Sequence, residues 1–404
     1  MNAEARGGYA TLAVCSAAAL FEGFDNQSMG VAAPRLLAEL GLSSRLSGVV
    51  FSAAAMGLVV GAVTGGRVAD FIGRRRTLAV SLALFGLCSL LTATAGNAVE
   101  LFLARLATGL GLGGAMPNFI ALAAEAAAHR HRLRTVTLVM ALMPLGGAVA
   151  GLMALGERYG WTWRAIFYVG GSVPLLLSLL IAIGLRSAGE AAHRSRELLP
   201  APAAVANVAT VLFGAGQAAT TLLLWAGYFF TQLVLLLMLN WLPSLIVGMG
   251  FSHAQASWAS ICFNVSGAVG AGILGSLHAG PHRRLWVVLT YVGMAAALAG
   301  VAAVAGSFAH VAAACALAGV FIIGAQLILF ALAPMYYAAP TRGTGVGAAV
   351  AAGRAGSIVG PLVAGALLAG GSASSTVLLA IVPFVALGGA AALALTWRPS
   401  QPAA

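Results

Sequence analysis

The stretch GRVADFIGRRRTL, residues 66–78, places one aspartate, four arginines and two glycines between two long apolar runs. Those runs, 46–68 and 77–95, are each long enough to cross the hydrocarbon core of a bilayer, which takes about 20 residues of helix. Glycine permits a tight turn, and arginines at the ends of apolar runs are typical of the cytoplasmic side of a membrane. The stretch therefore predicts a short charged turn between two membrane helices.

The composition of the whole chain agrees with this interpretation. Of its 404 residues, 61% are hydrophobic and 8% are charged, and the mean hydropathy is +0.98. A soluble protein has about a quarter of its residues charged, so this chain belongs in a membrane. The net charge of +11 does not indicate nucleic-acid binding, because that requires a basic patch on a folded aqueous domain.

Apolar runs between charged or Pro/Gly breaks predict an all-α membrane protein with twelve transmembrane helices in two six-helix pseudo-repeats. The spans are expected near 9–32, 46–68, 77–95, 99–124, 135–156, 163–185, 221–247, 256–277, 285–305, 309–334, 343–368 and 374–397. The longest connection predicts a cytoplasmic linker at 187–220, between an N-terminal half at 1–186 and a C-terminal half at 221–404.

The arginines predict the orientation of the chain, since all 21 basic residues are arginine. With both termini in the cytoplasm, 15 arginines fall at the cytoplasmic ends of the spans and four at the opposite ends, as the positive-inside rule requires. The other two, Arg105 and Arg354, lie within spans. The halves also repeat: Gly66 has a counterpart at Gly275, a shift of 209, and Arg134 has one at Arg342, a shift of 208. Secondary transporters are commonly built from such duplicated units.

The first span contains two acids within one turn, Glu22 and Asp25. A charged group at the bilayer centre costs at least ~2.5–3.5 kcal/mol, so two acids in one span indicate a functional use. They lie on one helix face, and burial beside a like charge raises proton affinity, which is what a proton carrier near neutral pH requires. A structural ion pair with Arg105 or Arg354 is the alternative, and the two roles can coexist.

The stretch at 66–78 resembles the loop between helices 2 and 3 of the major facilitator superfamily, whose pattern is G-x-L-A-D-R-x-G-R-R-x-x-L. Val68 and Phe71 depart from that pattern. A carboxylate and clustered guanidinium groups at the cytoplasmic gate can pair with helix ends and with Glu125, although Glu125 could instead transfer protons. The expected gate residues are Asp70, Arg74, Arg75, Glu125 and Arg342, with ordinary topogenic charge as the alternative.

Further motifs resemble the aromatic acid:proton symporter family within that superfamily. They are Glu22-Gly-Phe-Asp in span 1, Arg105-Leu-Ala-Thr-Gly in span 4, Asn240-Trp-Leu-Pro in span 7, and Arg342-Gly-Thr-Gly leading to Arg354 in span 11. The resemblance runs over about 20–366. Glu22 in place of the usual first aspartate, with Gln27 and the Asn240 motif, is most similar to the 3-(3-hydroxyphenyl)propionate transporters of that family.

Arg354 is the better candidate for binding a substrate carboxylate, because it lies about three turns into span 11 and no Asp or Glu follows Glu197. An intramembrane guanidinium is costly, and a carboxylate would bind it with two parallel hydrogen bonds. A pair with Asp25 or Glu22 from the other half is the alternative. Arg105 is expected either to clamp the substrate carboxylate or to pair with one of those acids, and the resemblance implies that it participates in transport.

Polar residues within the spans could bind a phenolic hydroxyl, although each alone is expected to form an interhelical hydrogen bond. These residues are Asn26, Gln27, Asn118, Gln232, Asn240, Asn264 and Gln326. Of these, Asn118, Asn240 and Gln326 are candidate substrate-binding residues. Phe24 and Tyr228 are candidate contacts to the substrate ring, because they neighbour the polar sites.

Three other patterns have ordinary explanations. Trp225, Tyr336 and Tyr337 lie near span ends and are expected in the interfacial aromatic belt. The sequence around Pro144 and Gly146 partly resembles an antiporter motif, but such residues also bend helices and allow close packing. The four cysteines lie singly in apolar runs without His partners, so they are expected to pack as small hydrophobic residues.

The expected function is import of aromatic carboxylates, such as 3-(3-hydroxyphenyl)propionate or hydroxybenzoates, coupled to protons by alternating access. The sequence has no nucleophile elbow, metal cluster or phosphate loop, so neither an enzyme nor a cofactor is expected. The expected partners are substrate, protons and membrane lipid, with no nucleic acid, and the expected state is a monomer in the inner membrane. The alternatives are a drug:proton antiporter of the same fold and a non-transporting membrane sensor, in which two halves would be superfluous.

Overall fold

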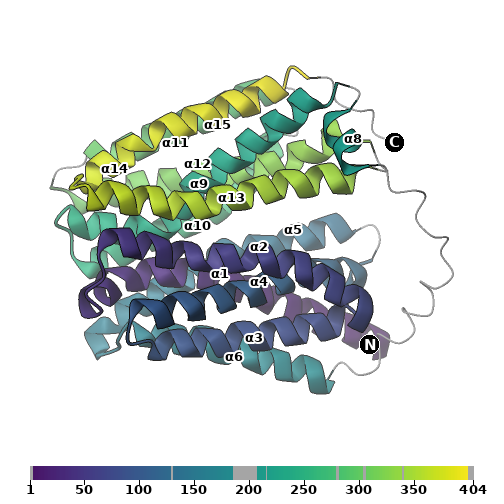
Figure 1. Ribbon diagram of the computed structural model, residues 1–404, viewed down its shortest axis with the longest axis horizontal. Helices are drawn as coiled ribbons and strands as arrows, with labels where there is room; N and C mark the ends of the chain where they lie inside the picture. Colours follow the sequence, from purple (N-terminus) through teal and green to yellow (C-terminus); the bar gives the residue numbers. More distant parts are fainter. Residues whose placement is uncertain are drawn as a thin grey trace. The chain divides into compact units, whose positions relative to one another are not determined.

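The residues that can be described form two compact helical units (Figure 1). The computed structural model describes residues 3–128, 131–184, 207–214, 216–278, 282–303, 306–338 and 341–398. Unit 1 is Met1–Ala201 and unit 2 is Pro202–Ala404. The predicted linker spans 187–220, and its part up to residue 206 lies outside the described residues. Beyond that point, helix α8 (Val208–Phe213) forms and α9 begins at Ala218, before the predicted boundary.

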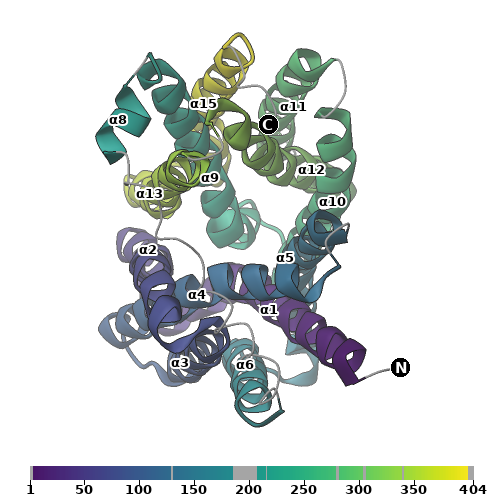
Figure 2. The same cartoon turned by 90° about the vertical axis from the view of Figure 1, so that its right-hand side faces the viewer.

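Unit 1 is built from long helices that correspond to the first six predicted spans. They are α1 (Ala3–Glu39), α2 (Ser44–Ile72), α3 (Arg74–Thr94), α4 (Ala98–Ala126), α5 (Arg132–Ala154) and α6 (Arg164–Gly184), with a 3-10 turn at Leu155–Tyr159. Helix α1 packs along α5, α4 lies against both α2 and α3, and α3 also packs on α6 (Figure 2). The helices that carry Glu22 and Arg105, α1 and α4, are in contact.

Unit 2 repeats this arrangement. Its long helices are α9 (Ala218–Gly248), α10 (His253–His278), α11 (Arg283–Ala303), α12 (Phe308–Leu332) and α13 (Arg342–Ala369), followed by α14 (Ser374–Ala380) and α15 (Val382–Leu395), with a 3-10 turn at Ala333–Tyr336. The single span predicted at 374–397 is broken at Ile381. Pro383 explains the break, because proline cannot donate the backbone hydrogen bond that would continue α14.

The duplication expected from the sequence is visible in the helix starts and in the packing. Helices α2 and α3 begin 209 residues before α10 and α11, at Ser44 and His253 and at Arg74 and Arg283. Helices α4, α5 and α6 begin 210 residues before α12, α13 and α14. The packing of α1 on α5, α2 on α4 and α3 on α4 recurs as α9 on α13, α10 on α12 and α11 on α12. Two six-helix pseudo-repeats are therefore confirmed.

The length and apolarity of the helices make the chain a multi-pass membrane protein. Eleven segments in the described part of the chain are long and apolar enough to cross a membrane, with α14 and α15 counted as one segment. Helix α1 is not among them, although its 37 residues would span about 55 Å at ~1.5 Å per residue. Its polar residues Glu22, Asp25, Asn26 and Gln27 lower its hydropathy, and we take it as the twelfth span.

Glycines set the turn between α2 and α3 and the contact between α2 and α4. Gly73 is the one residue between α2 and α3, and its φ of 86° is a conformation that residues with a side chain rarely adopt. The tight turn predicted from the sequence is therefore confirmed. A Cβ at Gly109 of α4 would overlap the carbonyl of Ala54 in α2, so small residues allow these two backbones to approach closely.

Candidate functional site

Asp25 of α1 and Arg105 of α4 form a buried ion pair inside unit 1. The Nη1 and Nη2 atoms of the guanidinium donate to Oδ1 and Oδ2 of the carboxylate at 2.8 and 2.7 Å. The arginine and aspartate side chains are 3% and 2% exposed, and the guanidinium carbon lies 5.8 Å from the centre of the Phe167 ring of α6. Bidentate pairs of this kind are the stronger class of charged hydrogen bond. Of the alternatives left open by the sequence, the structure therefore pairs Arg105 with Asp25.

Glu22 lies one turn before Asp25 on α1 and is also buried, with 2% of its surface exposed. The backbone of this turn is held tightly against α5. A Cβ at Gly23 would overlap the carbonyl of Met143, and a Cβ at Gly146 would overlap the backbone of α1. The glycine of the partial antiporter motif thus has a packing role, and it helps to hold the two acids in the interior of unit 1.

Phe24 and Asn118 have the contacts of packing residues rather than of substrate ligands. Phe24 is fully buried, and a Cβ at Gly170 of α6 would lie 2.9 Å from Cε1 of its ring. The side-chain amide of Asn118 donates to the carbonyl of Gly114, one turn earlier in α4, at 2.8 Å. That hydrogen bond lies within one helix, whereas an interhelical one was expected. The structure therefore gives no support to these two residues as substrate contacts.

The arginine-rich end of unit 1 joins three helices. Arg74, at the start of α3, donates to the carboxylate of Glu125 near the end of α4. Arg75 donates from Nη2 to the carbonyl of Ile181 near the end of α6 at 2.6 Å, where a cation also complements the helix dipole. The pairing with Glu125 and with a helix end was expected from the sequence. Asp70, in the last turn of α2, is exposed; in unit 2, the gate candidate Arg342 is the exposed first residue of α13.

A third ion pair, between α1 and α6, was not predicted from the sequence. Arg164 donates from Nη1 to Oε1 of Glu39 at 2.6 Å, and the indole nitrogen of Trp163 donates to Oε2 at 2.6 Å. The guanidinium also lies 4.4 Å from the ring centre of Trp163. The hydrogen bond from Arg164, and to a lesser extent that from Trp163, lowers the pKa of Glu39. Glu39 lies beyond the predicted span at 9–32. Only the adjacent Trp and Arg that begin the predicted span at 163–185 could have signalled this contact.

In unit 2, α13 packs closely on α9 beside the predicted carboxylate-binding residue, Arg354. A Cβ at Gly356 would overlap the carbonyl of Phe229, and a Cβ at Gly353 would lie 3.3 Å from Cδ1 of Tyr228. Arg354, the next residue along α13, is half-buried. The packing therefore brings the backbone that carries Arg354 to the level of Tyr228 on α9.

Three buried polar side chains on α9 and α12 of unit 2 present atoms that have no hydrogen-bond partner within the described residues. They are the hydroxyl of Tyr228 and Oε1 of Gln232 on α9, and both Oε1 and Nε2 of Gln326 on α12. The three side chains are 1%, 8% and 7% exposed. The Tyr228 ring packs edge-on against Phe330 with the ring centres 5.6 Å apart. Because buried polar groups are nearly always hydrogen-bonded, such a group of atoms is expected to have a partner beyond the chain itself.

Other polar and aromatic residues of unit 2 have structural partners. Asn240 donates to a carbonyl of its own helix at 2.8 Å, rather than across to a neighbour as expected. The hydroxyl of Tyr336 donates to the carbonyl of Leu395 at 2.6 Å, and the hydroxyls of Tyr337 and Thr221 share a hydrogen bond at 2.9 Å. Both tyrosines are 1% exposed. Their predicted place in the aromatic belt is therefore wrong, because α9 and α15 provide their hydrogen-bond partners inside unit 2.

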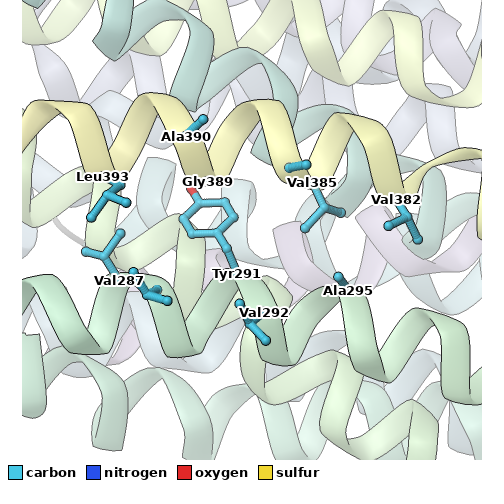
Figure 3. A pocket seen from close by; sticks show the side chains of 11 residues that line it. Val287, Tyr291, Val292, Ala295, Val382, Val385, Gly389, Ala390 and Leu393 are labelled. Atoms are coloured by element: carbon cyan, nitrogen blue, oxygen red, sulfur yellow. The ribbon is translucent and has the colours of Figure 1, made fainter.

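A cavity of about 250 Å³ lies between α11 and α15 (Figure 3). Its lining includes Val287, Tyr291, Val385 and Leu393 and contains no charged side chain. The hydroxyl of Tyr291 is already engaged with Thr231 at 2.8 Å. This cavity therefore offers nothing that would neutralise a carboxylate, whereas α9, α12 and α13 carry polar side chains in the interior of unit 2.

Comparison with known proteins agrees with the fold and with the motifs. The chain matches the Major Facilitator Superfamily over residues 15–337. It is 41% identical to the 3-(3-hydroxy-phenyl)propionate transporter of Escherichia coli (strain K12), over 97% of this chain and 94% of that protein. It is 34% identical to the gallate transporter of Pseudomonas putida, over 88% and 85% of the two chains. It is 32% identical to the 4-hydroxybenzoate transporter PcaK of Pseudomonas aeruginosa, over 94% and 90%.

Solved structures give the same architecture at low sequence identity. A bacterial homologue of the human lysosomal transporter Spinster matches with a TM-score of 0.77 and 15% identity, over 95% of this chain and 96% of that one. A D-xylose-proton symporter matches with a TM-score of 0.74 and 17% identity, over 96% and 97%. At these identities the likeness supports the fold alone. The chain belongs to the major facilitator superfamily of membrane transporters, as its duplicated helices, the family match and the relatives aligned over most of their length together show.

Proposed function

We propose that this transporter imports aromatic carboxylates together with protons by alternating access. The observation that carries the proposal is the similarity to three transporters named for 3-(3-hydroxyphenyl)propionate, gallate and 4-hydroxybenzoate. All three compounds combine an aromatic ring, at least one ring hydroxyl and a carboxylate. The 41% identity over nearly the full length of both chains favours 3-(3-hydroxyphenyl)propionate as the first substrate to test.

In this proposal Arg354 binds the substrate carboxylate. It is half-buried in α13, and the chain has no Asp or Glu after Glu197, so the C-terminal half contributes no acidic side chain that would repel a bound carboxylate. The planar guanidinium group can hold a carboxylate with two parallel hydrogen bonds. Arg105 is already engaged by Asp25 in unit 1, so it would contact substrate only in a state in which that pair has opened.

The acids of α1 are proposed to carry the proton. Protonation of Asp25 would remove the negative charge that holds Arg105, and the bidentate pair would weaken. Proton binding and a rearrangement of α1 against α4 would then be coupled through one pair of side chains. Glu22, one turn away and buried, is the second proton-binding candidate, because neighbouring acids shift one another's proton affinity.

The charged end of unit 1 is proposed to be the cytoplasmic gate. The pair between Arg74 and Glu125 and the contact of Arg75 with α6 would be formed in one state and released in another, with Asp70 and Arg342 as further gate charges. The distribution of arginines supports cytoplasmic termini, and we propose that the protein lies in the inner membrane. We propose a monomer as the transporting unit.

The test is uptake into proteoliposomes that contain the purified full-length protein. With an inward proton gradient, labelled 3-(3-hydroxyphenyl)propionate should accumulate, and dissipation of the gradient should abolish accumulation. Failure with a panel of aromatic acids would reject the proposal. The same assay separates it from a drug:proton antiporter, which would drive its substrate in the direction opposite to the protons.

A further inference from the structure

The register of α9 against α12 follows from contacts at two levels of unit 2. Near the start of α9, the hydroxyl of Thr221 shares a hydrogen bond with that of Tyr337, which follows α12. Tyr228 lies seven residues after Thr221 on α9, and its ring packs on that of Phe330, which lies seven residues before Tyr337. Residue numbers therefore rise along α9 as they fall along α12, and the two helices run antiparallel.

This register brings two glutamines to the same level. Gln232 lies one turn after Tyr228 on α9, and Gln326 lies one turn before Phe330 on α12, so each glutamine shares a helix face with its aromatic neighbour. Because the helices are antiparallel, both glutamines lie on the same side of the contact between the two rings. Gly353 of α13 adjoins this group, since a Cβ there would lie 3.2 Å from Cγ of Gln232.

The unsatisfied atoms of this group match the hydrogen-bonding needs of a phenol. A phenolic hydroxyl donates one hydrogen bond and accepts others. Oε1 of Gln232 and Oε1 of Gln326 are acceptors, Nε2 of Gln326 is a donor, and the hydroxyl of Tyr228 can act as either. The Tyr228 and Phe330 rings also offer aromatic surface beside these atoms.

We propose that Tyr228, Gln232 and Gln326 bind the ring hydroxyl of the substrate and so select hydroxylated aromatic acids over unsubstituted ones. This inference rests on the proposed function and deepens it, because it assigns the hydroxyl to α9 and α12 while Arg354 on the adjoining α13 takes the carboxylate. A site built to hydrogen-bond a hydroxyl discriminates strongly against an analogue that lacks it, since the polar groups of the site are then left unpaired.

The test compares uptake of 3-(3-hydroxyphenyl)propionate and 3-phenylpropionate, which differ only in the hydroxyl, by the full-length protein in proteoliposomes. The wild type should prefer the hydroxylated acid in kcat/KM by roughly tenfold or more. Gln326→Met is close in size but lacks both amide atoms, and Tyr228→Phe removes one oxygen and keeps the ring on Phe330. Each variant should lower kcat/KM for the hydroxylated acid without lowering that for 3-phenylpropionate, because fewer polar atoms are then left unpaired beside the unsubstituted ring.

Thr290→Val is the matched control, because the Thr290 hydroxyl is also buried and without a partner among the described residues, but lies on α11. It should keep the wild-type preference. Wild-type preference in both Gln326→Met and Tyr228→Phe, or an equal loss of both substrates, would overturn the inference while leaving aromatic acid transport in place. If the wild type accumulates neither acid nor any other aromatic carboxylate, the proposed function fails and the inference fails with it.

Discussion

Replacing Asp25 with asparagine tests the buried ion pair of unit 1 both as a stabilising contact and as the coupling element. The substitution keeps the size of the side chain but leaves the Arg105 guanidinium, which is 3% exposed, without its opposing charge. Removing one partner of a buried ion pair costs about 3–5 kcal/mol. The melting temperature of the detergent-solubilised protein should fall by about 6–20 °C, at roughly 2–4 °C per kcal/mol for a domain of this size.

The matched control removes both charges at once. In Asp25→Asn with Arg105→Gln, neither member of the pair carries a charge, and replacing a buried pair as a whole is often close to neutral. The double variant should therefore recover most of the stability that Asp25→Asn loses. Adding Arg105→Gln alone completes a double-mutant cycle, which gives the interaction energy of the pair.

The transport assay on Asp25→Asn separates coupling from binding. Uptake against a concentration gradient should be lost, because asparagine cannot take up the proton that is proposed to open the pair with Arg105. Exchange of labelled for unlabelled substrate should remain, since exchange requires no net proton movement. Uphill uptake equal to that of the wild type would remove Asp25 from the coupling mechanism. A melting temperature within about 2 °C of the wild type would refute the energetic argument for the pair.

Three further outcomes are expected. Arg354→Lys keeps the charge but loses the planar fork, so the Kd for an aromatic carboxylate should rise about tenfold or more; an unchanged Kd in a binding titration would place the carboxylate elsewhere. Hydrogen bonds from Arg164 hold the pKa of Glu39 below its ordinary value of 4.5, so the stabilisation is present above that value and is lost as the pH falls through the lowered folded-state pKa. The melting temperatures of wild type and Glu39→Gln should differ at neutral pH and converge in strong acid, and a difference that is independent of pH would contradict this. Gly23→Ala should destabilise the protein by about 1–3 kcal/mol, because its Cβ would overlap the carbonyl of Met143; denaturation at the wild-type temperature would show that α1 and α5 separate without cost.

The positions of the helices could be predicted from the sequence because they depend on local properties. The apolar runs at 46–68 and 77–95 lie within or close to α2 and α3, and Gly73 marks the turn between them. The pairing of Arg74 with Glu125 was also predictable, since both residues lie at helix ends on the side that the repeated charge pattern assigns to the cytoplasm. The alternatives for Asp25, in contrast, could not be decided in this way.

Partners inside the helix bundle were decided only by the tertiary structure. The sequence left Asp25 with two candidate arginines, and the contact between α1 and α4 selects Arg105, 80 residues away. It placed Tyr336 and Tyr337 at a membrane interface, whereas both are buried and hydrogen-bonded.

The two glutamines of unit 2 also show which features the sequence identifies and which the packing decides. The sequence alone identified Gln232 and Gln326 as polar residues in separate spans, 94 positions apart. Their common level follows from the antiparallel packing of α9 on α12, which no local pattern specifies. Apolar runs and breakers determine where each helix begins and ends, because those features act within a few turns. Which helix lies beside which depends on packing over the whole unit, and that packing decides which side chains meet.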